Sequence, residues 1–202
     1  MSQIVLPLEL GSDAPARIVI GTGNRAVAEA LADPAHWPYR TAILAGPPRA
    51  GKTLLARWFE AGGAGEAIDD ADRADETALF HRWNRAQEDG RALLLTVSSA
   101  GWTIALPDLA SRMGAALALE IGAPDDTEMA ELMLAHAERR GLALGEGAPA
   151  YLVPRIERSH AAIERVVAEI DRLSLERMMP ATLSVWRDAL DAVQGPEQGR
   201  LL

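Results

Sequence analysis

The sequence contains no cysteine among its 202 residues. Disulfide bonds, cysteine-ligated zinc sites and thiol-based catalysis are therefore all excluded. The chain also lacks an apolar run of membrane-spanning length, and its first residues show no basic segment followed by an apolar one. From these absences we expect a cytoplasmic protein that binds no membrane.

Positive charge is also in short supply, because 29 acidic residues outnumber 20 basic ones and leave a formal net charge of −9 at pH 7. A protein that neutralises many DNA phosphates needs an excess of lysine and arginine, so we expect no direct specific binding to DNA. The hydrophobic content of 49% is ordinary for a globular protein. Length and composition together predict one domain with a sizeable core, or such a domain with a small accessory one.

Lysine is the scarcest basic residue, since Lys52 is the single lysine among the 20 lysine and arginine residues. It lies in a match to the phosphate-binding pattern G-x-x-x-x-G-K-[ST]. That match consists of Gly46, Pro47, Pro48, Arg49, Ala50, Gly51, Lys52 and Thr53. In such a loop backbone N–H groups turn toward a phosphate, the lysine contacts β- and γ-phosphate oxygens, and the last hydroxyl ligates magnesium. The sequence therefore predicts binding of ADP or ATP with Mg²⁺, with Thr53 as a metal ligand.

Acidic and polar side chains follow the next two apolar segments. Asp69 and Asp70 come after a short apolar step, and Thr96 and Ser98 stand at the end of the apolar run 92–97. A magnesium-bound nucleotide needs a carboxylate at the end of a neighbouring strand, near the metal and the attacking water. We assign Asp69 to the metal and Asp70 to polarising water. Thr96 and Ser98 are candidate contacts to the γ-phosphate.

Two patterns divide the chain. Up to residue 122, apolar strand-like runs alternate with helical patterns, which is typical of a parallel α/β domain. The expected strands are 18–20, 41–45, 67–68, 92–97 and 117–121, and the expected helices are 24–31, 53–60, 75–89 and 106–113. Beyond it only helical patterns occur, at 125–140, 151–158, 161–178 and 183–193. We predict an N-terminal segment over 1–16, a P-loop α/β domain over 17–122 and a small all-helical domain over 123–202.

The order of these motifs resembles the AAA+ module of the DnaA clade, and within that clade the Hda-like regulators. The most specific matches are 106–112 (Leu-Pro-Asp-Leu-Ala-Ser-Arg), 68–73 (Ile-Asp-Asp-Ala-Asp-Arg) and 155–159 (Arg-Ile-Glu-Arg-Ser). The resemblance covers nearly the whole chain. It implies a P-loop sheet with a helical lid, and a regulator that stimulates ATP hydrolysis on the initiator DnaA rather than turning over ATP alone.

The first residues extend this resemblance. Gln3, Leu6, Pro7 and Leu8 are similar to the Q-x-x-L-P-L peptide by which Hda-like proteins dock on the DNA sliding clamp. In such a peptide the glutamine supplies a two-sided hydrogen-bonding group, the leucines enter an apolar pocket, and proline lowers the entropy cost of ordering. The resemblance thus implies the sliding clamp as a partner beside DnaA.

The resemblance also assigns two arginines. Arg112 matches the arginine finger that acts in trans on a partner's γ-phosphate. The lid arginine that touches phosphates in many relatives aligns here with Ala161, and Arg158, three residues earlier, is the candidate replacement.

The sequence departs from the family where only about eight residues separate Glu60 from Asp69, so we expect the sheet to lack one edge strand. Two other functions stay open at this point. One is a small P-loop kinase whose phosphate-clamping lid consists of Arg139, Arg140, Arg155 and Arg158. The other is a binding module similar to helicase loaders.

Overall fold

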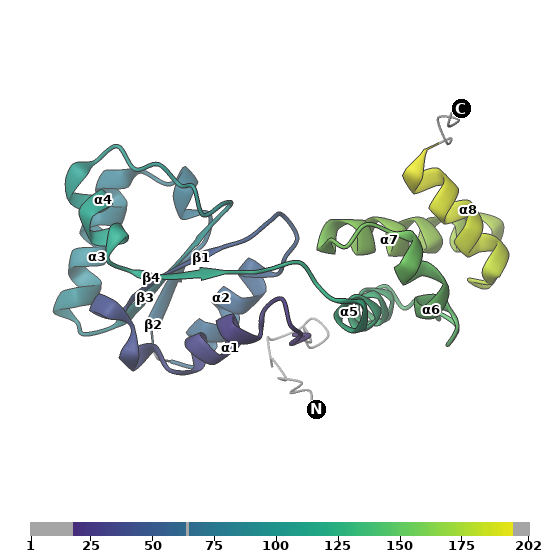
Figure 1. The fold of residues 1–202 in the computed structure, drawn as a ribbon, viewed down its shortest axis with the longest axis horizontal. Helices are drawn as coiled ribbons and strands as arrows, with labels where there is room; N and C mark the ends of the chain where they lie inside the picture. Colours follow the sequence, from purple (N-terminus) through teal and green to yellow (C-terminus); the bar gives the residue numbers. More distant parts are fainter. Residues whose placement is uncertain (1–17, 64, 196–202) are drawn as a thin grey trace. The chain divides into compact units, whose positions relative to one another are not determined.

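The computed structural model describes residues 18–63 and 65–195, and four parallel strands in them form one sheet (Figure 1). The strands are β1 (Thr41–Ala45), β2 (Gly65–Ile68), β3 (Ala92–Val97) and β4 (Leu117–Glu120). Their order across the sheet is β2-β3-β1-β4. Because every neighbouring pair is parallel, all four strands end at the same edge of the sheet. The expected strands at 41–45 and 92–97 are confirmed.

Helices cover both faces of this sheet, which explains why β3 is buried along its whole length. The helices of this part are α1 (Arg25–Ala32), α2 (Lys52–Ala61), α3 (Glu76–Glu88) and α4 (Pro107–Gly114). Leu93, Leu95 and Val97 of β3 form one cluster with Leu79 of α3 and Leu109 of α4. The alternate side chains of β3 point to the opposite face, where α2 packs on β2 and β3.

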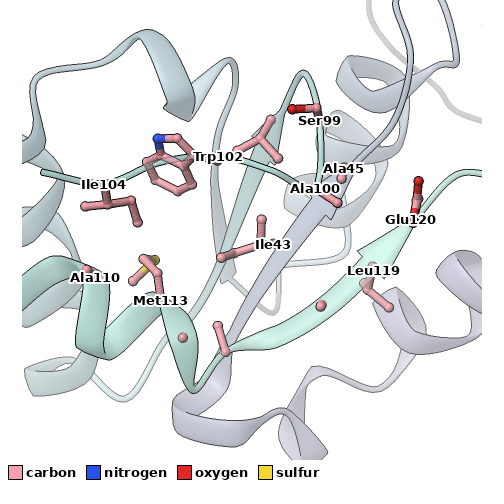
Figure 2. Close-up of a pocket in the computed structure, with 14 residues that line it drawn as sticks. Ile43, Ala45, Ser99, Ala100, Trp102, Ile104, Ala110, Met113, Leu119 and Glu120 are labelled. Carbon is pink, nitrogen blue, oxygen red and sulfur yellow. The ribbon is translucent and has the colours of Figure 1, made fainter.

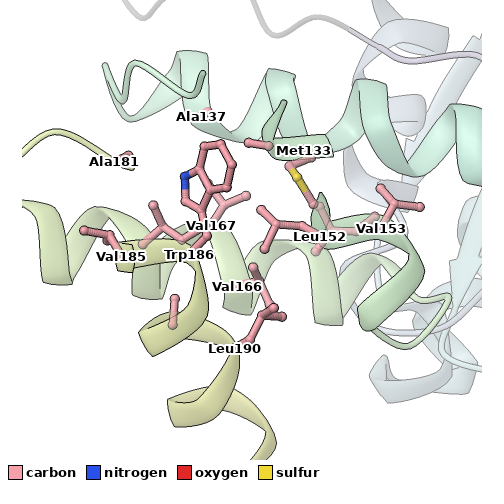
Figure 3. Close-up of a cluster of buried hydrophobic side chains, with 14 of the residues drawn as sticks. Met133, Ala137, Leu152, Val153, Val166, Val167, Ala181, Val185, Trp186 and Leu190 are labelled. Atoms are coloured by element: carbon pink, nitrogen blue, oxygen red, sulfur yellow. The ribbon is translucent and has the colours of Figure 1, made fainter. Parts of the chain in front are cut away.

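From residue 123 onward the chain is helical, and it buries a core of its own. Its helices are α5 (Asp126–Arg139), α6 (Ala148–Leu152), α7 (His160–Arg177) and α8 (Leu183–Gln194). Figure 3 shows Met133, Val167 and Trp186 in this core. The described residues between 22 and 122 form one compact unit, and residues 18–21 with 123–195 form a second. The described residues contain no helix both long and apolar enough to cross a bilayer.

One helix start follows the local capping rule, and two expected elements differ from the structure. The Asp125 carboxylate accepts a hydrogen bond from the Glu128 N–H at 2.8 Å, as its position before α5 predicts. The expected helix 151–158 is wrong: α6 ends at Leu152 and a 3₁₀ turn, Val153–Arg155, follows it. Pro154 explains the break because it lacks the N–H that would continue the helix. The expected strand 18–20 is also wrong, since only an isolated bridge occurs there, at Ile18.

The strand β2 forms an edge of the sheet, where the sequence predicted a missing strand. On the open side of β2, the Ala67 N–H donates to the Glu60 side chain, at Oε1, with a distance of 3.0 Å. Glu66 on the same strand forms an ion pair with Arg82 at 2.9 Å. Unpaired edge groups invite pairing with another chain, and charged side chains prevent it. The last turn of α2 thus caps the edge that a further strand would occupy in a longer domain.

The close packing of this edge gives a stability prediction at Gly65. A Cβ atom there would lie 2.3 Å from the Ala92 carbonyl oxygen and 2.6 Å from Phe59 Cζ. We expect Gly65→Ala to lower the free energy of unfolding by about 1–3 kcal/mol, because backbone must move to admit the methyl group. Gly114→Ala is the matched control, since no heavy atom lies within 4 Å of its Cβ position. Urea unfolding of both variants measures this difference, and equal stabilities would contradict it.

Candidate functional site

The loop between β1 and α2 adopts the tight course that a phosphate-binding loop requires. Arg49 and Gly51 both have positive φ angles, of 68° and 86°. Such conformations turn successive N–H groups toward one side, and glycine adopts them without strain. The Lys52 ammonium donates to the carbonyl oxygens of Gly46 at 2.7 Å and Pro47 at 3.1 Å. The single lysine of the chain therefore contacts the first residues of the loop that the phosphate-binding pattern predicted.

The structure brings Thr53, Asp69 and Thr96 together from three different elements. The Thr53 hydroxyl at the start of α2 donates to Asp69 Oδ2 at 2.6 Å. The Thr96 hydroxyl of β3 donates to Asp69 Oδ1 and accepts the Asp70 N–H at 3.0 Å. Magnesium that is bound to a nucleotide usually takes only one or two protein oxygens, so Thr53 and Asp69 fit such an ion. No cluster of three or more acidic or histidine side chains that could hold a metal occurs in residues 18–63 and 65–195.

Asp70 follows directly in a left-handed conformation, with φ of 50°. Non-glycine residues rarely adopt it, and such backbone strain is often retained at functional sites. Its carboxylate lies 3.9 Å from the Arg73 guanidinium, and both side chains are more than half exposed. Asp70 is therefore at the strand ends beside Asp69, with an accessible carboxylate. Its role in polarising water stays a prediction.

Asp72 is a residue of this edge that sequence reasoning did not assign to the site. One of its carboxylate oxygens accepts both the Ser98 N–H, at 3.0 Å, and the Ser98 hydroxyl. Burial raises the pKa of Asp72, but the hydrogen bonds from Ser98 outweigh this and lower the pKa below its usual value. Because its proton points to Asp72, the Ser98 hydroxyl cannot donate to a phosphate in this arrangement. The sequence did offer a signal for Asp72, because three of the four residues 69–72 are aspartates.

Thr96 is fully buried, with 0% of its surface exposed. We therefore interpret it as a positioning residue for Asp69 rather than as a direct contact to phosphate. This differs from the sequence-based assignment because the strand pattern gave the position of Thr96 but not the face to which its side chain points.

The two predicted arginines lie in different units of the chain. The Arg112 guanidinium stacks on the rings of Phe80 and Trp83, with its Cζ atom 4.6 Å and 4.9 Å from the ring centroids. Arg158 belongs to the helical unit, where it forms an ion pair with Asp126 at 2.9 Å. The contact of Arg158 with nucleotide stays a prediction. The residues predicted to bind the clamp, Gln3, Leu6, Pro7 and Leu8, lie outside the described residues.

A cavity of about 470 Å³ lies on one face of the sheet rather than at the phosphate loop (Figure 2). Ile43 of β1 and Met113 of α4 line it together with Trp102 and Ile104 of the loop between β3 and α4. Its lining is mostly apolar, and Glu120 is its one charged residue. None of the loop residues 46–53 lines this cavity, although Ala45 and Ser99 at the neighbouring strand ends do.

Solved structures of replication and recombination proteins share this fold. Domain III of the Thermotoga maritima replication initiation protein DnaA superposes with a TM-score of 0.73 and 15% identity, covering 89% of this chain and 95% of that one. A replication initiator DnaA bound to AMPPCP and single-stranded DNA gives a TM-score of 0.61 and 16% identity, covering 80% of this chain and 66% of that one. The Thermotoga maritima RuvB Holliday junction branch migration motor gives 0.60 and 18%, covering 86% and 70%.

The fold is the one seen in DnaA domain III. This confirms the expected P-loop α/β sheet with a helical C-terminal part. No protein-family profile matches the sequence. At identities of 15–18% the likeness establishes the fold alone, so function has to be argued from the site.

The two threonines of the site give a paired prediction. Thr96→Val removes the hydroxyl that serves Asp69 and the Asp70 N–H in a fully buried position, so we expect a loss of about 1–3 kcal/mol in unfolding free energy. Thr53→Val alters an exposed hydroxyl and should change stability by no more than about 0.5 kcal/mol. Chemical unfolding compares them. A larger loss for Thr53→Val than for Thr96→Val would contradict our interpretation of Thr96.

Proposed function

We propose that this protein is an AAA+ regulator of replication initiation, similar to the Hda-like proteins. In this proposal it binds ADP or ATP with magnesium, docks on the DNA sliding clamp and stimulates ATP hydrolysis by DnaA. The observation that carries the nucleotide part is the assembly of Lys52 with Thr53 and Asp69 at the strand ends. The fold, shared with DnaA domain III over 89% of the chain, supports the family part.

In this proposal, different residues of the loop and of the turn after β2 contact different parts of the nucleotide and its magnesium ion. Backbone N–H groups at Gly51 and at the start of α2 would face the phosphates with their positive dipole ends, whereas Pro47 and Pro48 carry no N–H. Lys52 adds a compact charge for the β- and γ-phosphate oxygens. Thr53 and Asp69 would hold Mg²⁺, which when bound neutralises the charge that develops on the phosphates. Asp70 would then orient water at an accessible edge of this site.

Arg112 acts on a different nucleotide in this proposal, the one bound by DnaA. A phosphoryl-transfer transition state spreads negative charge over the γ-phosphoryl oxygens, and a guanidinium supplied in trans stabilises that charge. Arginine suits this role because its planar fork donates two hydrogen bonds to a phosphoryl group. The clamp peptide Gln3–Leu8 would bring the protein to DNA-loaded clamps, where it meets DnaA.

Nucleotide binding is tested by thermal unfolding. A ligand that binds only the native state raises the melting temperature, so we expect a rise with magnesium and ADP or ATP in the wild type and none in Lys52→Ala. Asp69→Asn should lose only the part of the rise that depends on magnesium. Absence of any shift in the wild type at millimolar nucleotide would refute the nucleotide part of the proposal.

Regulation of DnaA is tested with DnaA that carries labelled ATP, clamps loaded on DNA and variants of this protein. We expect Arg112→Ala to abolish ADP formation above the level of DnaA alone, because known arginine fingers contribute about 10³–10⁵-fold. Arg112→Lys should fail nearly as badly. The triple variant Gln3→Ala, Leu6→Ala and Leu8→Ala should lose clamp binding and the stimulation that depends on it, while its melting temperature stays unchanged. If Arg112→Ala stimulates as well as the wild type, the proposed role of Arg112 is wrong.

A further inference from the structure

One face of α3 is occupied by α4, the helix that carries Arg112. Glu76, Phe80 and Trp83 are spaced four and three residues apart, so their side chains lie on the same side of α3. The Glu76 carboxylate accepts the Ala105 N–H at 2.9 Å and the Leu106 N–H at 2.6 Å, at the start of α4. It thereby satisfies N–H groups that precede the first turn of α4 and fixes this end of the helix on α3.

Phe80 and Trp83 hold the other end of α4 through Arg112. Both rings lie within 5 Å of the guanidinium carbon, at 4.6 Å and 4.9 Å, which is within the range of cation–π contacts. The Nη1 group of Arg112 also donates to the Asp108 carbonyl one turn earlier, at 2.9 Å. Two aromatic contacts and one hydrogen bond therefore restrict the rotation of this long side chain.

The Trp83 ring is itself held by a hydrogen bond to the sheet. Its Nε1–H donates to the Thr41 hydroxyl at 3.0 Å, and that hydroxyl donates to the Tyr39 carbonyl at 2.9 Å. Thr41 is fully buried at the start of β1. The orientation of the ring, and with it the position of the guanidinium, is thus set by the central sheet.

This arrangement is poorly explained as packing alone. The Nε atom of Arg112 is buried and has no hydrogen-bond acceptor within the described part of the chain, and a buried donor without an acceptor costs free energy. A leucine or methionine would pack on the same rings without that cost. The guanidinium is therefore retained at the expense of local stability, which points to a use for its charge.

We propose that Phe80 and Trp83 are positioning residues that pre-orient the Arg112 guanidinium for a γ-phosphoryl group bound by a partner protein. This inference rests on the proposed function of Arg112. Restricting the side chain before the encounter removes an entropy cost that would otherwise be paid in the transition state. Loss of an aromatic ring should therefore lower the stimulated rate at saturation and leave the concentration for half-maximal stimulation unchanged.

The test uses the DnaA-stimulation assay with Phe80→Leu and Trp83→Leu, which keep apolar bulk and remove the π face. We expect each to lower the saturating rate about tenfold, the ratio that corresponds to a cation–π contact of roughly 1.4 kcal/mol. Trp83→Phe keeps a ring and should restore the rate to within about threefold of the wild type. Trp102→Leu is the matched control, because Trp102 packs against the same core cluster, whereas the cation–π contacts of Arg112 among the described residues are with Phe80 and Trp83.

A second readout needs no partner. In the NMR spectrum of the free wild-type protein, the Arg112 Nε–Hε signal, identified by its loss in Arg112→Ala, should be shifted upfield by the ring currents. This shift should shrink in both leucine variants and persist in Trp102→Leu. An Arg112 signal without a ring-current shift in the wild type would overturn the proposal even if a leucine variant failed to fold.

The outcomes separate this inference from the function on which it rests. If Arg112→Ala abolishes stimulation while Phe80→Leu and Trp83→Leu match Trp102→Leu, the positioning role is wrong and the function of Arg112 stands. If Arg112→Ala retains full stimulation, both are wrong. A rise in the half-maximal concentration at an unchanged saturating rate would show that the rings serve partner binding instead, which also overturns the proposal.

Discussion

The arrangement of the candidate nucleotide site depends on one carboxylate, that of Asp69, which accepts a hydrogen bond from a hydroxyl on each of its two oxygens. One hydroxyl comes from Thr53 at the start of α2 and the other from Thr96 at the end of β3. Parallel strands bring their ends to a common edge, but they do not fix the spacing of the side chains there. The two hydrogen bonds supply that spacing, and they place a carboxylate between the start of α2 and the end of β3. The left-handed turn at Asp70 follows from the same contact, because the Asp70 N–H is also held by Thr96.

The short connection between α2 and β2 leaves no room for a further strand, and such a strand would lie beyond β2, away from the candidate site. The strands that carry the site, β2, β3 and β1, are neighbours in that order, and β2 is at the edge. A strand missing beyond β2 therefore leaves every pairing among the site strands intact. What it exposes is the outer backbone of β2, and Glu60 satisfies the Ala67 N–H there. Gly65 allows the compact connection, since any side chain at this position would collide with the Ala92 carbonyl.

Sequence reasoning succeeded where a local pattern decides the structure and missed contacts that depend on strand order. The strand at 92–97 is set by a local apolar run, and it was predicted. The pairing of Asp72 with Ser98 joins residues that are 26 positions apart, so it follows only once β2 is known to lie beside β3. The helix predicted over 151–158 is wrong because the prediction relied on the spacing of apolar residues and gave too little weight to Pro154, which breaks the helix. The roles of Arg158 and of Gln3–Leu8 depend on a partner or on a second unit, which no pattern within the described sheet domain can decide.

The helix α3 connects the candidate nucleotide site with the region around Arg112. The acidic turn that contains Asp70 and Asp72 leads directly into α3, whose start is capped by the Asp75 carboxylate on the Ala78 N–H at 2.8 Å. Seven residues after Glu76, the same helix presents Trp83 to Arg112. Rigid elements hold side chains more accurately than loops do, so a helix that begins beside Asp70 and Asp72 is a suitable support for a residue proposed to act on a partner's nucleotide. The position of Arg112 is thus determined by the same sheet that positions Asp69, although the two residues would serve different phosphates.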